Sequence, residues 1–401
     1  MGMLKVLDPW FDPIEQIREL YDTDQTVQIA QKYSELISKH VDPPYAFAVN
    51  GAWGGKTTFL RYLCDDLETK GHETLWFNPW EYERQGDVVL ALQKQMAAKF
   101  KSILGKSLKE MGVFGWAFVG AGLDTLSKLL GVSEYDDISK IVEDADKAIK
   151  NKQYEQYEDL VRKTKNEFRN LTQQVQKKTK KFLIVFLDDL DRCLPENALS
   201  ILEALKNLFI VDGAQVVFLC GIDTGVAKQF IRSRYQGIES NFAINYFKKI
   251  FNYTIELPRV PPENFKKNLI SYIKNLFGNQ APIIKDMADR VLLLSNLAGN
   301  RSLRSIFNVV NQYYVIQQVV DYPVNGDKVL PILFLKEKWH GFYEQVVVEA
   351  RKSAEPHTEL RTILSSDELQ DLAEPYLRAY LKNDEAKPIT TVAELNELNL
   401  L

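Results

Sequence analysis

Cysteine and histidine are scarce in this chain. Its 401 residues include 3 cysteines and 4 histidines, and no two cysteines have the C-x-x-C spacing. Isolated cysteines argue against a disulfide framework and fit a reducing compartment. So few Cys and His residues also argue against a structural zinc site. We therefore expect a cytoplasmic protein that does not depend on zinc.

The chain also lacks an excess of basic residues. Its 50 Lys and Arg residues face 54 Asp and Glu residues, which leaves a net charge of −4. No broad positive field therefore indicates a nucleic acid or an anionic membrane as partner, although local basic patches leave nucleic acid open.

The first thirteen residues, MGMLKVLDPWFDP, hold no long apolar segment, and Val6 stands where a myristoylation signal has Ser or Thr.

Long hydrophobic runs are absent as well. The longest uncharged apolar run, Met111 to Leu123, has 13 residues, whereas a membrane-spanning helix needs about 17 to 25. A buried or interfacial helix is the favoured interpretation. The alternative is a short segment that re-enters or lies on a bilayer, so any membrane association would go through this run.

Five apolar runs predict the strands of a sheet. They are Tyr45–Val49, Thr74–Phe77, Phe182–Leu187, Val216–Ile222 and Tyr253–Leu257. Several are almost continuously apolar, as expected of strands covered on both faces, and helical patterns stand between them. Alternation of strands and helices predicts a parallel α/β sheet with helices on both faces.

The composition along the chain suggests five regions. Residues 1–44 are an N-terminal helical segment, and residues 45–100 begin the α/β core. Residues 101–180, first glycine-rich and apolar and then highly charged, are predicted to be a helical insertion. The core resumes over residues 181–262, and residues 263–401 form a helical C-terminal region.

A glycine-rich turn follows the first predicted strand. The sequence from Gly51 to Thr57 reads GAWGGKT, between an apolar strand and an apolar helix. This is the organisation of a phosphate-binding loop (Walker A), in which backbone N–H groups and a helix N-terminus surround phosphates. Lys56 would contact the β- and γ-phosphates, and Thr57 would bind Mg²⁺.

The loop is one residue shorter than the usual pattern. G-x-x-x-x-G-K-[ST] has four residues between the first glycine and the Gly-Lys pair, whereas Gly51 and Gly55 enclose three. Either the loop is short, or Asn50 replaces the first glycine in a left-handed backbone conformation. The predicted nucleotide-binding residues are Asn50, Gly51, Ala52, Trp53, Gly54, Gly55, Lys56, Thr57, Thr58 and Asp223.

Two carboxylates follow the third predicted strand. In an open parallel sheet the ligand lies beyond the carboxyl ends of the strands, so Asp188 and Asp189 are expected beside the phosphate-binding loop. Asp188 is predicted to hold Mg²⁺ together with Thr57, directly or through water. Asp189 is predicted to polarise the attacking water, which makes it the catalytic carboxylate (Walker B).

Other polar residues are candidates for contact with the γ-phosphate. Asp223 follows the fourth strand and either senses this phosphate or caps the next helix. Arg192, Arg301 and Arg304 are candidates for a charge-stabilising arginine, while the alternative for the last two is an ordinary helix surface. With Lys56 and Asp189, these arginines complete the predicted catalytic set.

Several stretches together resemble the KAP family of P-loop NTPases. They are the tryptophan-containing loop at residues 51–57, Trp76 to Trp80 (WFNPW), Asp188 to Arg192 (DDLDR) and Tyr246 to Ile250 (YFKKI). The similarity covers about residues 20 to 310. It implies a P-loop NTPase sheet with a helical insertion between Walker A and Walker B, a position where many members carry transmembrane segments. The Gly299-Asn300 pair resembles a family G-N-P-R turn without its proline.

The resemblance implies an ATPase that uses ATP and Mg²⁺ to drive a conformational or assembly switch, with a protein partner or a second copy of the chain. Several bacterial members are linked to phage or plasmid exclusion, so a role in antiviral defence is an expectation by resemblance. The alternative is a nucleotide-gated scaffold that binds ATP with little turnover and acts by oligomerising or recruiting a partner. The short loop predicts slow or partner-dependent hydrolysis.

Overall fold

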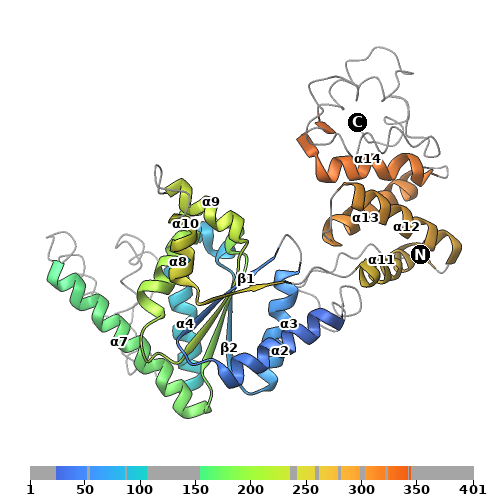
Figure 1. Cartoon of the computed structure of the whole chain (residues 1–401). Helices are drawn as coiled ribbons and strands as arrows, with labels where there is room; N and C mark the ends of the chain where they lie inside the picture. Colours follow the sequence, from blue (N-terminus) through green and yellow to red (C-terminus); the bar gives the residue numbers. More distant parts are fainter. Residues whose placement is uncertain are drawn as a thin grey trace. The chain divides into compact units, whose positions relative to one another are not determined.

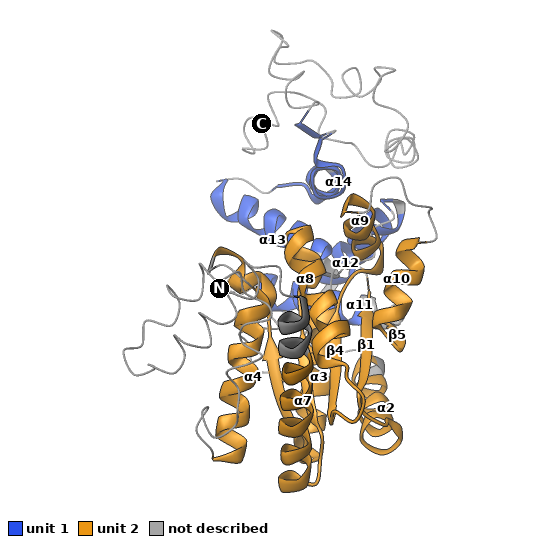
Figure 2. Ribbon diagram, turned by 90° about the vertical axis from the view of Figure 1, so that its left-hand side faces the viewer, with its two compact units in different colours: residues 1–23, 259–401 blue, residues 24–258 orange. Residues whose placement is uncertain are grey.

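The computed structural model describes residues 24–51, 55–85, 88–105, 154–234, 242–257, 262–278, 281–298, 303–320, 324–341 and 343–344. The chain divides into two compact units, shown in different colours in Figure 2. One unit is Asp24–Pro258. The other combines Met1–Thr23 with Arg259–Leu401.

A five-stranded sheet forms the centre of the Asp24–Pro258 unit. Its strands are β1 (Tyr45–Asn50), β2 (Glu73–Phe77), β3 (Leu183–Leu187), β4 (Val216–Gly221) and β5 (Tyr253–Glu256). They lie in the order β2-β3-β4-β1-β5, and every neighbouring pair is parallel. Each residue of β3 and β4 is buried, which is why these strands read as continuous apolar runs. The predicted parallel α/β sheet is confirmed.

Helices cover both faces of this sheet (Figure 1). On one face lie α2 (Asp24–His40) and α3 (Lys56–Thr69). The opposite face carries α4 (Val88–Leu104), α7 (Tyr154–Thr179), α8 (Pro195–Ala204), α9 (Thr224–Arg234) and α10 (Phe242–Ile250). Three short elements connect strands and helices: η1 (Pro79–Gln85), η2 (Leu190–Arg192) and the π-helical turn η3 (Leu205–Phe209).

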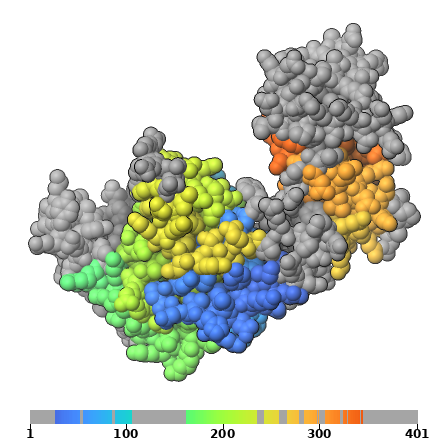
Figure 3. All heavy atoms as spheres, in the orientation of Figure 1, coloured from blue at the N-terminus to red at the C-terminus, as the bar shows by residue number. Residues whose placement is uncertain are grey.

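The helix α2 is amphipathic, as its apolar periodicity predicts. Ala30 and Ile37 are fully buried, whereas Glu35 and Lys39 form an exposed ion pair one turn apart. In the space-filling view the outer side chains of α2, in blue, form part of the surface of this unit (Figure 3). Its buried side packs against α3, the helix that follows the phosphate-binding loop.

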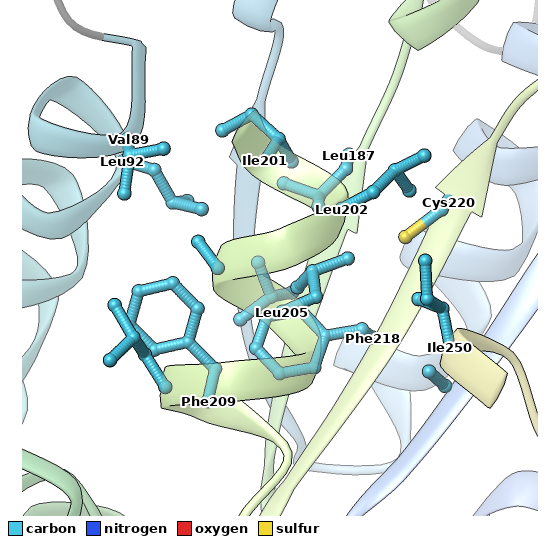
Figure 4. Close-up of a cluster of buried hydrophobic side chains, with 14 of the residues drawn as sticks. Val89, Leu92, Leu187, Ile201, Leu202, Leu205, Phe209, Phe218, Cys220 and Ile250 are labelled. Atoms are coloured by element: carbon cyan, nitrogen blue, oxygen red, sulfur yellow. The ribbon is translucent and has the colours of Figure 1, made fainter. Parts of the chain in front are cut away.

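A large hydrophobic cluster anchors the helices to one face of the sheet (Figure 4). Leu92 of α4, Leu202 of α8 and Phe218 of β4 all belong to it. The Phe209 ring, from η3, lies with its centroid 6.2 Å from that of Phe218. Because protein cores are densely packed, this cluster holds the ends of β3 and β4 in place, where the candidate site lies.

The charged stretch before β3 contributes to this core. In α7, Phe168, Leu171 and Val175 are buried in the cluster, and the Phe168 ring lies 6.2 Å from that of Phe100 in α4. The C-terminal part of the predicted insertion is thus a structural helix of the core unit. The apolar run Met111 to Leu123 lies outside the described residues. Within the described ranges, no helix is long and apolar enough to cross a membrane.

Four helices represent the predicted helical C-terminal region: α11 (Pro262–Phe277), α12 (Ala281–Leu297), α13 (Leu303–Val319) and α14 (Gly326–Lys338). They share a separate hydrophobic core, in which the rings of Tyr272 and Phe307 stack with centroids 4.0 Å apart. The Asn325 side chain caps α14 by accepting a hydrogen bond from the Asp327 N–H at 2.8 Å.

Candidate functional site

The phosphate-binding loop joins the carboxyl end of β1 to the start of α3. Gly55 lies just before the first residue of α3 and has a φ angle of 106°, which residues other than glycine rarely adopt. A Cβ atom on Gly51 would lie 2.9 Å from Cδ1 of Leu257, so the backbone passes close to the end of β5 there. Ala52, Trp53 and Gly54 lie outside the described residues.

Asn50 has another role than the left-handed turn considered from the sequence. It is the last residue of β1, and its side chain donates to Glu256 Oε2 at 2.7 Å and accepts from the Thr224 N–H at 3.0 Å. Around the loop, the described residue with positive φ is Gly55, not Asn50. The short-loop alternative is therefore the one that fits, and contact between Asn50 and nucleotide stays a prediction.

Lys56, the first residue of α3, is held by two acceptors. Its Nζ donates to the backbone oxygen of Gly51 at 3.0 Å and to Asp191 Oδ2 at 2.8 Å. The side chains of Lys56 and Asp191 are only 9% and 6% exposed. A buried charge needs a partner, and Asp191 supplies it. This contact brings the Walker A and Walker B motifs together, as predicted.

Asp188 is a buried carboxylate at the end of β3. It is 1% exposed, and neither of its side-chain oxygens has a hydrogen-bond partner. A Cβ atom on Gly221 of β4 would approach Asp188 Oδ1 to 2.6 Å, so glycine is needed beside it. Burial, followed by the charge of Asp189, raises the pKa of Asp188 to about 7, while the nearby Thr57 hydroxyl partly offsets this rise.

The residues present suit a magnesium ion. An unpartnered buried carboxylate is costly unless a cation or proton neutralises it, and carboxylate and hydroxyl oxygens are ligands that Mg²⁺ prefers. Asp188 and Thr57 would hold the ion. Within the described part of the chain no group of three or more His, Cys, Asp or Glu residues could bind a metal.

Asp189 lies next to Asp188 but is held differently. Its backbone is left-handed, with φ 58° and ψ 27°. Its Oδ1 pairs with Arg192 Nε at 3.1 Å, and its Oδ2 accepts a hydrogen bond from Asn78 Nδ2 at 3.2 Å. Burial raises the pKa of Asp189, while the charge of Arg192 lowers it. A carboxylate kept in a buried and oriented position is suited to accept a proton from water.

The three candidate arginines have different positions. The Arg192 guanidinium pairs with Asp189 and also lies 5.8 Å from the centroid of the Trp80 ring. Arg301 lies outside the described residues, and Arg304 is in α13, without a described side chain. The choice among the three therefore stays a prediction.

Asp223 caps a helix. Its Oδ1 accepts hydrogen bonds from the N–H groups of Gly225 at 2.7 Å and Val226 at 3.2 Å, in the first turn of α9. The capping alternative is thus present in the structure, and a contact with the γ-phosphate stays a prediction. Thr58, another predicted nucleotide-binding residue, is a buried residue of α3.

Comparison with known proteins agrees with this geometry. The family model described as "KAP family P-loop domain" matches residues 27–320. The chain belongs to the KAP family of P-loop NTPases. The match begins in α2, ends just after α13 and includes all five strands. It confirms the resemblance predicted over about residues 20 to 310.

This KAP family chain is also similar to individual proteins. It is 27% identical over 166 residues to the uncharacterized protein MJ0182 of Methanocaldococcus jannaschii. The aligned region covers 39% of this chain and 77% of the relative. Domain III of the replication initiation protein DnaA from Thermotoga maritima is 12% identical, with a TM-score of 0.36 over 82% of this chain and 98% of that chain. RuvB from the same organism is 11% identical, with a TM-score of 0.30 over 92% and 88%.

Two residues of the KAP site were not assigned a role from the sequence. Asn78 contacts Asp189 across 111 positions of sequence, and Asp191 contacts Lys56 across 135. Both lie in motifs that the sequence singles out, WFNPW and DDLDR. The motifs could be recognised from their amino-acid composition, but the partner of each side chain depends on the order of the strands in the sheet.

Proposed function

We propose that this KAP family chain binds ATP with Mg²⁺ and hydrolyses it. The observation that supports this most strongly is the meeting of Lys56, Asp188 and Asp189 where β1 and β3 end. They offer a cation for phosphates, an unpartnered carboxylate for a metal and an oriented carboxylate for water.

The loop and Lys56 would bind the phosphates. Backbone N–H groups between Gly51 and Thr57, at the N-terminus of α3, favour negative charge. Lys56 is already beside Gly51 and would turn its ammonium from Asp191 to the β- and γ-phosphates. The shortened loop would offer one N–H fewer than the usual loop, so binding would be weaker than in a loop of standard length.

Thr57 and Asp188 would hold the metal ion. Bound Mg²⁺ neutralises charge on the phosphate oxygens. Asp188 must be deprotonated to act as a ligand, and the positive charge of a bound ion would favour this form against the burial that raises its pKa. Gly221 leaves the space that this carboxylate occupies.

Asp189 would activate water. As the water oxygen bonds to the γ-phosphorus, the bond from that phosphorus to the oxygen shared with the β-phosphate breaks, which leaves ADP. Asp189 accepts the proton that the water loses and returns it to solvent. Arg192, which pairs with Asp189, and the arginines at positions 301 and 304 are the candidates for stabilising the transferred phosphoryl group.

Hydrolysis would drive a change of conformation or assembly in a cytoplasmic protein. Asp188 and Asp189 are the only residues between β3 and η2, so a change at the nucleotide can reach α8 through η2. The inserted segment and the C-terminal helices are the proposed effectors, and a protein partner or second copy would complete the switch. A role in bacterial defence against phages or plasmids is proposed from the family alone.

The second candidate is a nucleotide-gated scaffold with little turnover. The buried Lys56–Asp191 ion pair favours it, because ATP must displace this contact before the lysine can serve the phosphates. In that case ATP binding, rather than hydrolysis, would change the assembly of the protein.

Two variants and a turnover assay test the proposal. Lys56→Ala should remove most ATP affinity, because the lysine contacts the phosphates of bound ATP. Asp189→Asn should keep binding but block phosphate release, because the second carboxylate acts on the water. Fluorescent ATP analogues measure affinity, and phosphate release at saturating ATP measures turnover.

The wild-type chain and a matched Asp212→Asn variant, changed on an exposed loop, provide the references. Binding without turnover in the wild type, alone and with added partner, supports the scaffold instead. Equal loss of binding in Lys56→Ala and Asp189→Asn contradicts the assigned roles.

A further inference from the structure

Asn78 is placed beside Asp189 by the sheet itself. Phe77, the last residue of β2, is paired with Leu187 of β3, and the Asp188 N–H donates to the Phe77 oxygen at 3.1 Å. Asn78 and Asp188, the next residues along the two chains, therefore lie at the same edge of the sheet, and Asp189 follows Asp188 directly. Asn78 and Asp189 are 7% and 9% exposed, and Asn78 Nδ2 donates to Asp189 Oδ2 at 3.2 Å.

The orientation of the Asn78 amide follows from a second contact. Its Oδ1 accepts a hydrogen bond from the Trp80 N–H at 3.1 Å. An N–H can only donate, so the oxygen of the amide must face Trp80 and the NH₂ group must face Asp189. The amide therefore presents a donor to the carboxylate in a defined direction.

Arg192 contacts the other oxygen of the same carboxylate. Its Nε lies 3.1 Å from Asp189 Oδ1, and its guanidinium lies near the Trp80 ring. The plane of the Asp189 carboxylate is thus set at both oxygens by groups from two elements, the β2–η1 junction and η2. Each carboxylate oxygen has two lone pairs, so one on each remains for a water molecule.

Charge alone does not define the direction of the Asp189 carboxylate. Lys56, Arg192 and Asp191 all act on its carboxyl group through their charge. Asp188 precedes it in the chain, and no described hydrogen bond joins the two side chains. Charge interactions depend weakly on angle, whereas the hydrogen bond from Asn78 depends strongly on it. Asn78 is therefore the neutral group best suited to aim this carboxylate.

We propose that Asn78 is a positioning residue for ATP hydrolysis, which aims Asp189 at the attacking water. This rests on the proposed hydrolysis and gives a function to the Asn of the WFNPW motif. A mere structural role is the competing explanation, since the Asn78 oxygen also orders the turn into η1 through Trp80.

Asn78→Asp separates the two explanations. An aspartate keeps the oxygen that accepts from the Trp80 N–H, but it replaces the donor facing Asp189 by a second oxygen. A structural role predicts near-normal turnover in this variant. The positioning role predicts a kcat about 10- to 100-fold lower, because small displacements of a reacting group have effects of this size, while affinity for a fluorescent ATP analogue is unchanged.

Asn78→Ala is the second variant, and it decides the question if Asn78→Asp does not fold. It should lower kcat without changing ATP affinity, and it should add no further loss in an Asp189→Asn background, because the residue acts through Asp189. Asn166→Asp, the same change at an exposed position of α7, is the control and should match the wild type.

The outcomes distinguish this inference from the proposed function. A wild type that binds ATP but never releases phosphate overturns the proposed hydrolysis, and the positioning role with it. A wild type that turns over, with unchanged kcat in Asn78→Asp or Asn78→Ala, overturns the positioning role alone. So does a loss in ATP affinity that matches the loss in kcat.

Discussion

The Lys56 ammonium lies 2.8 Å from the Asp191 carboxylate, and both side chains are almost completely buried. One residue begins the helix after the phosphate-binding loop, and the other lies three positions after the metal-ligand candidate Asp188. In the proposed site, the phosphates of ATP and the Asp191 carboxylate would compete for this ammonium.

We expect Asp191→Asn to bind ATP more tightly than the wild type. Without the carboxylate the buried ammonium is less well compensated, which lowers the stability of the free protein and increases the benefit of binding phosphates. A charge-assisted hydrogen bond of about 1.5–3 kcal/mol corresponds to roughly ten- to a hundredfold in affinity, so roughly a tenfold gain is expected. Calorimetric titration and the unfolding temperature with and without ATP measure both effects.

Asp212→Asn, at an exposed position, should change neither the affinity nor the unfolding temperature. Weaker ATP binding in Asp191→Asn would contradict the competition. It would mean that Asp191 prepares Lys56 for the phosphates instead.

An arginine substitution should slow hydrolysis strongly. A charge-stabilising arginine contributes on the order of 10³ to 10⁵ in rate. If one of Arg192, Arg301 and Arg304 has this role, alanine at that position should lower kcat by about the same factor. At Arg192 a lysine should restore part of the loss, because an ammonium can still pair with Asp189. Unchanged phosphate release in all three alanine variants would place the arginine elsewhere or show that none is used.

The length of the phosphate-binding loop offers a separate test. Insertion of a serine between Gly54 and Gly55 restores the usual spacing and one inward-pointing N–H. We expect higher basal ATP affinity or turnover, by roughly ten- to a hundredfold for one charge-assisted hydrogen bond. If the insertion abolishes both while the unmodified protein turns over rapidly alone, the short loop is not deficient.

Glu167 should make the stability of the protein depend on pH. Burial raises the pKa of this α7 carboxyl from 4.5 to about 7, and its Oε2 has no hydrogen-bond partner. Between these pH values the folded state keeps a proton that the unfolded state has lost. The contribution of Glu167 to stability therefore falls as the pH rises through this window and stays low above it.

Glu167→Gln removes that penalty. It should raise the unfolding temperature at about pH 8 and have little effect near pH 4, since the folded and unfolded states are then both protonated at this position. Glu35→Gln is the control, because its exposed carboxylate pairs with Lys39 and its pKa is lowered instead. Equal effects of Glu167→Gln at both pH values would contradict this account. Thermal unfolding at a series of pH values provides the measurement.

The strands and the class of the fold could be predicted from the amino-acid pattern alone. Largely apolar runs predicted the five strands, and the structure confirms all five, each with one boundary shifted by a single residue. The glycines and lysine predicted a loop from strand to helix, and α3 begins at Lys56. These features can be predicted locally, because an apolar run and a glycine-rich turn each consist of residues close together in the chain.

Some features needed the tertiary structure. The sequence pattern identified α7 as charged and helical, but the burial of Phe168 and Val175 depends on the helices that α7 meets. Asp223 could sense phosphate or cap a helix, and the structure places its oxygen on the N–H groups of α9. The high pKa of Asp188 likewise arises from burial, which no motif encodes.

The pairs Lys56–Asp191 and Asn78–Asp189 show most clearly the difference between what the sequence predicts and what depends on tertiary structure. The motifs that contain these residues are recognisable in the sequence, yet the partners are 135 and 111 positions apart. They meet because β2 pairs with β3 and because β4 alone separates β3 from β1. The order of strands results from the packing of the whole sheet and its helices, so only the tertiary structure could decide which side chain holds which.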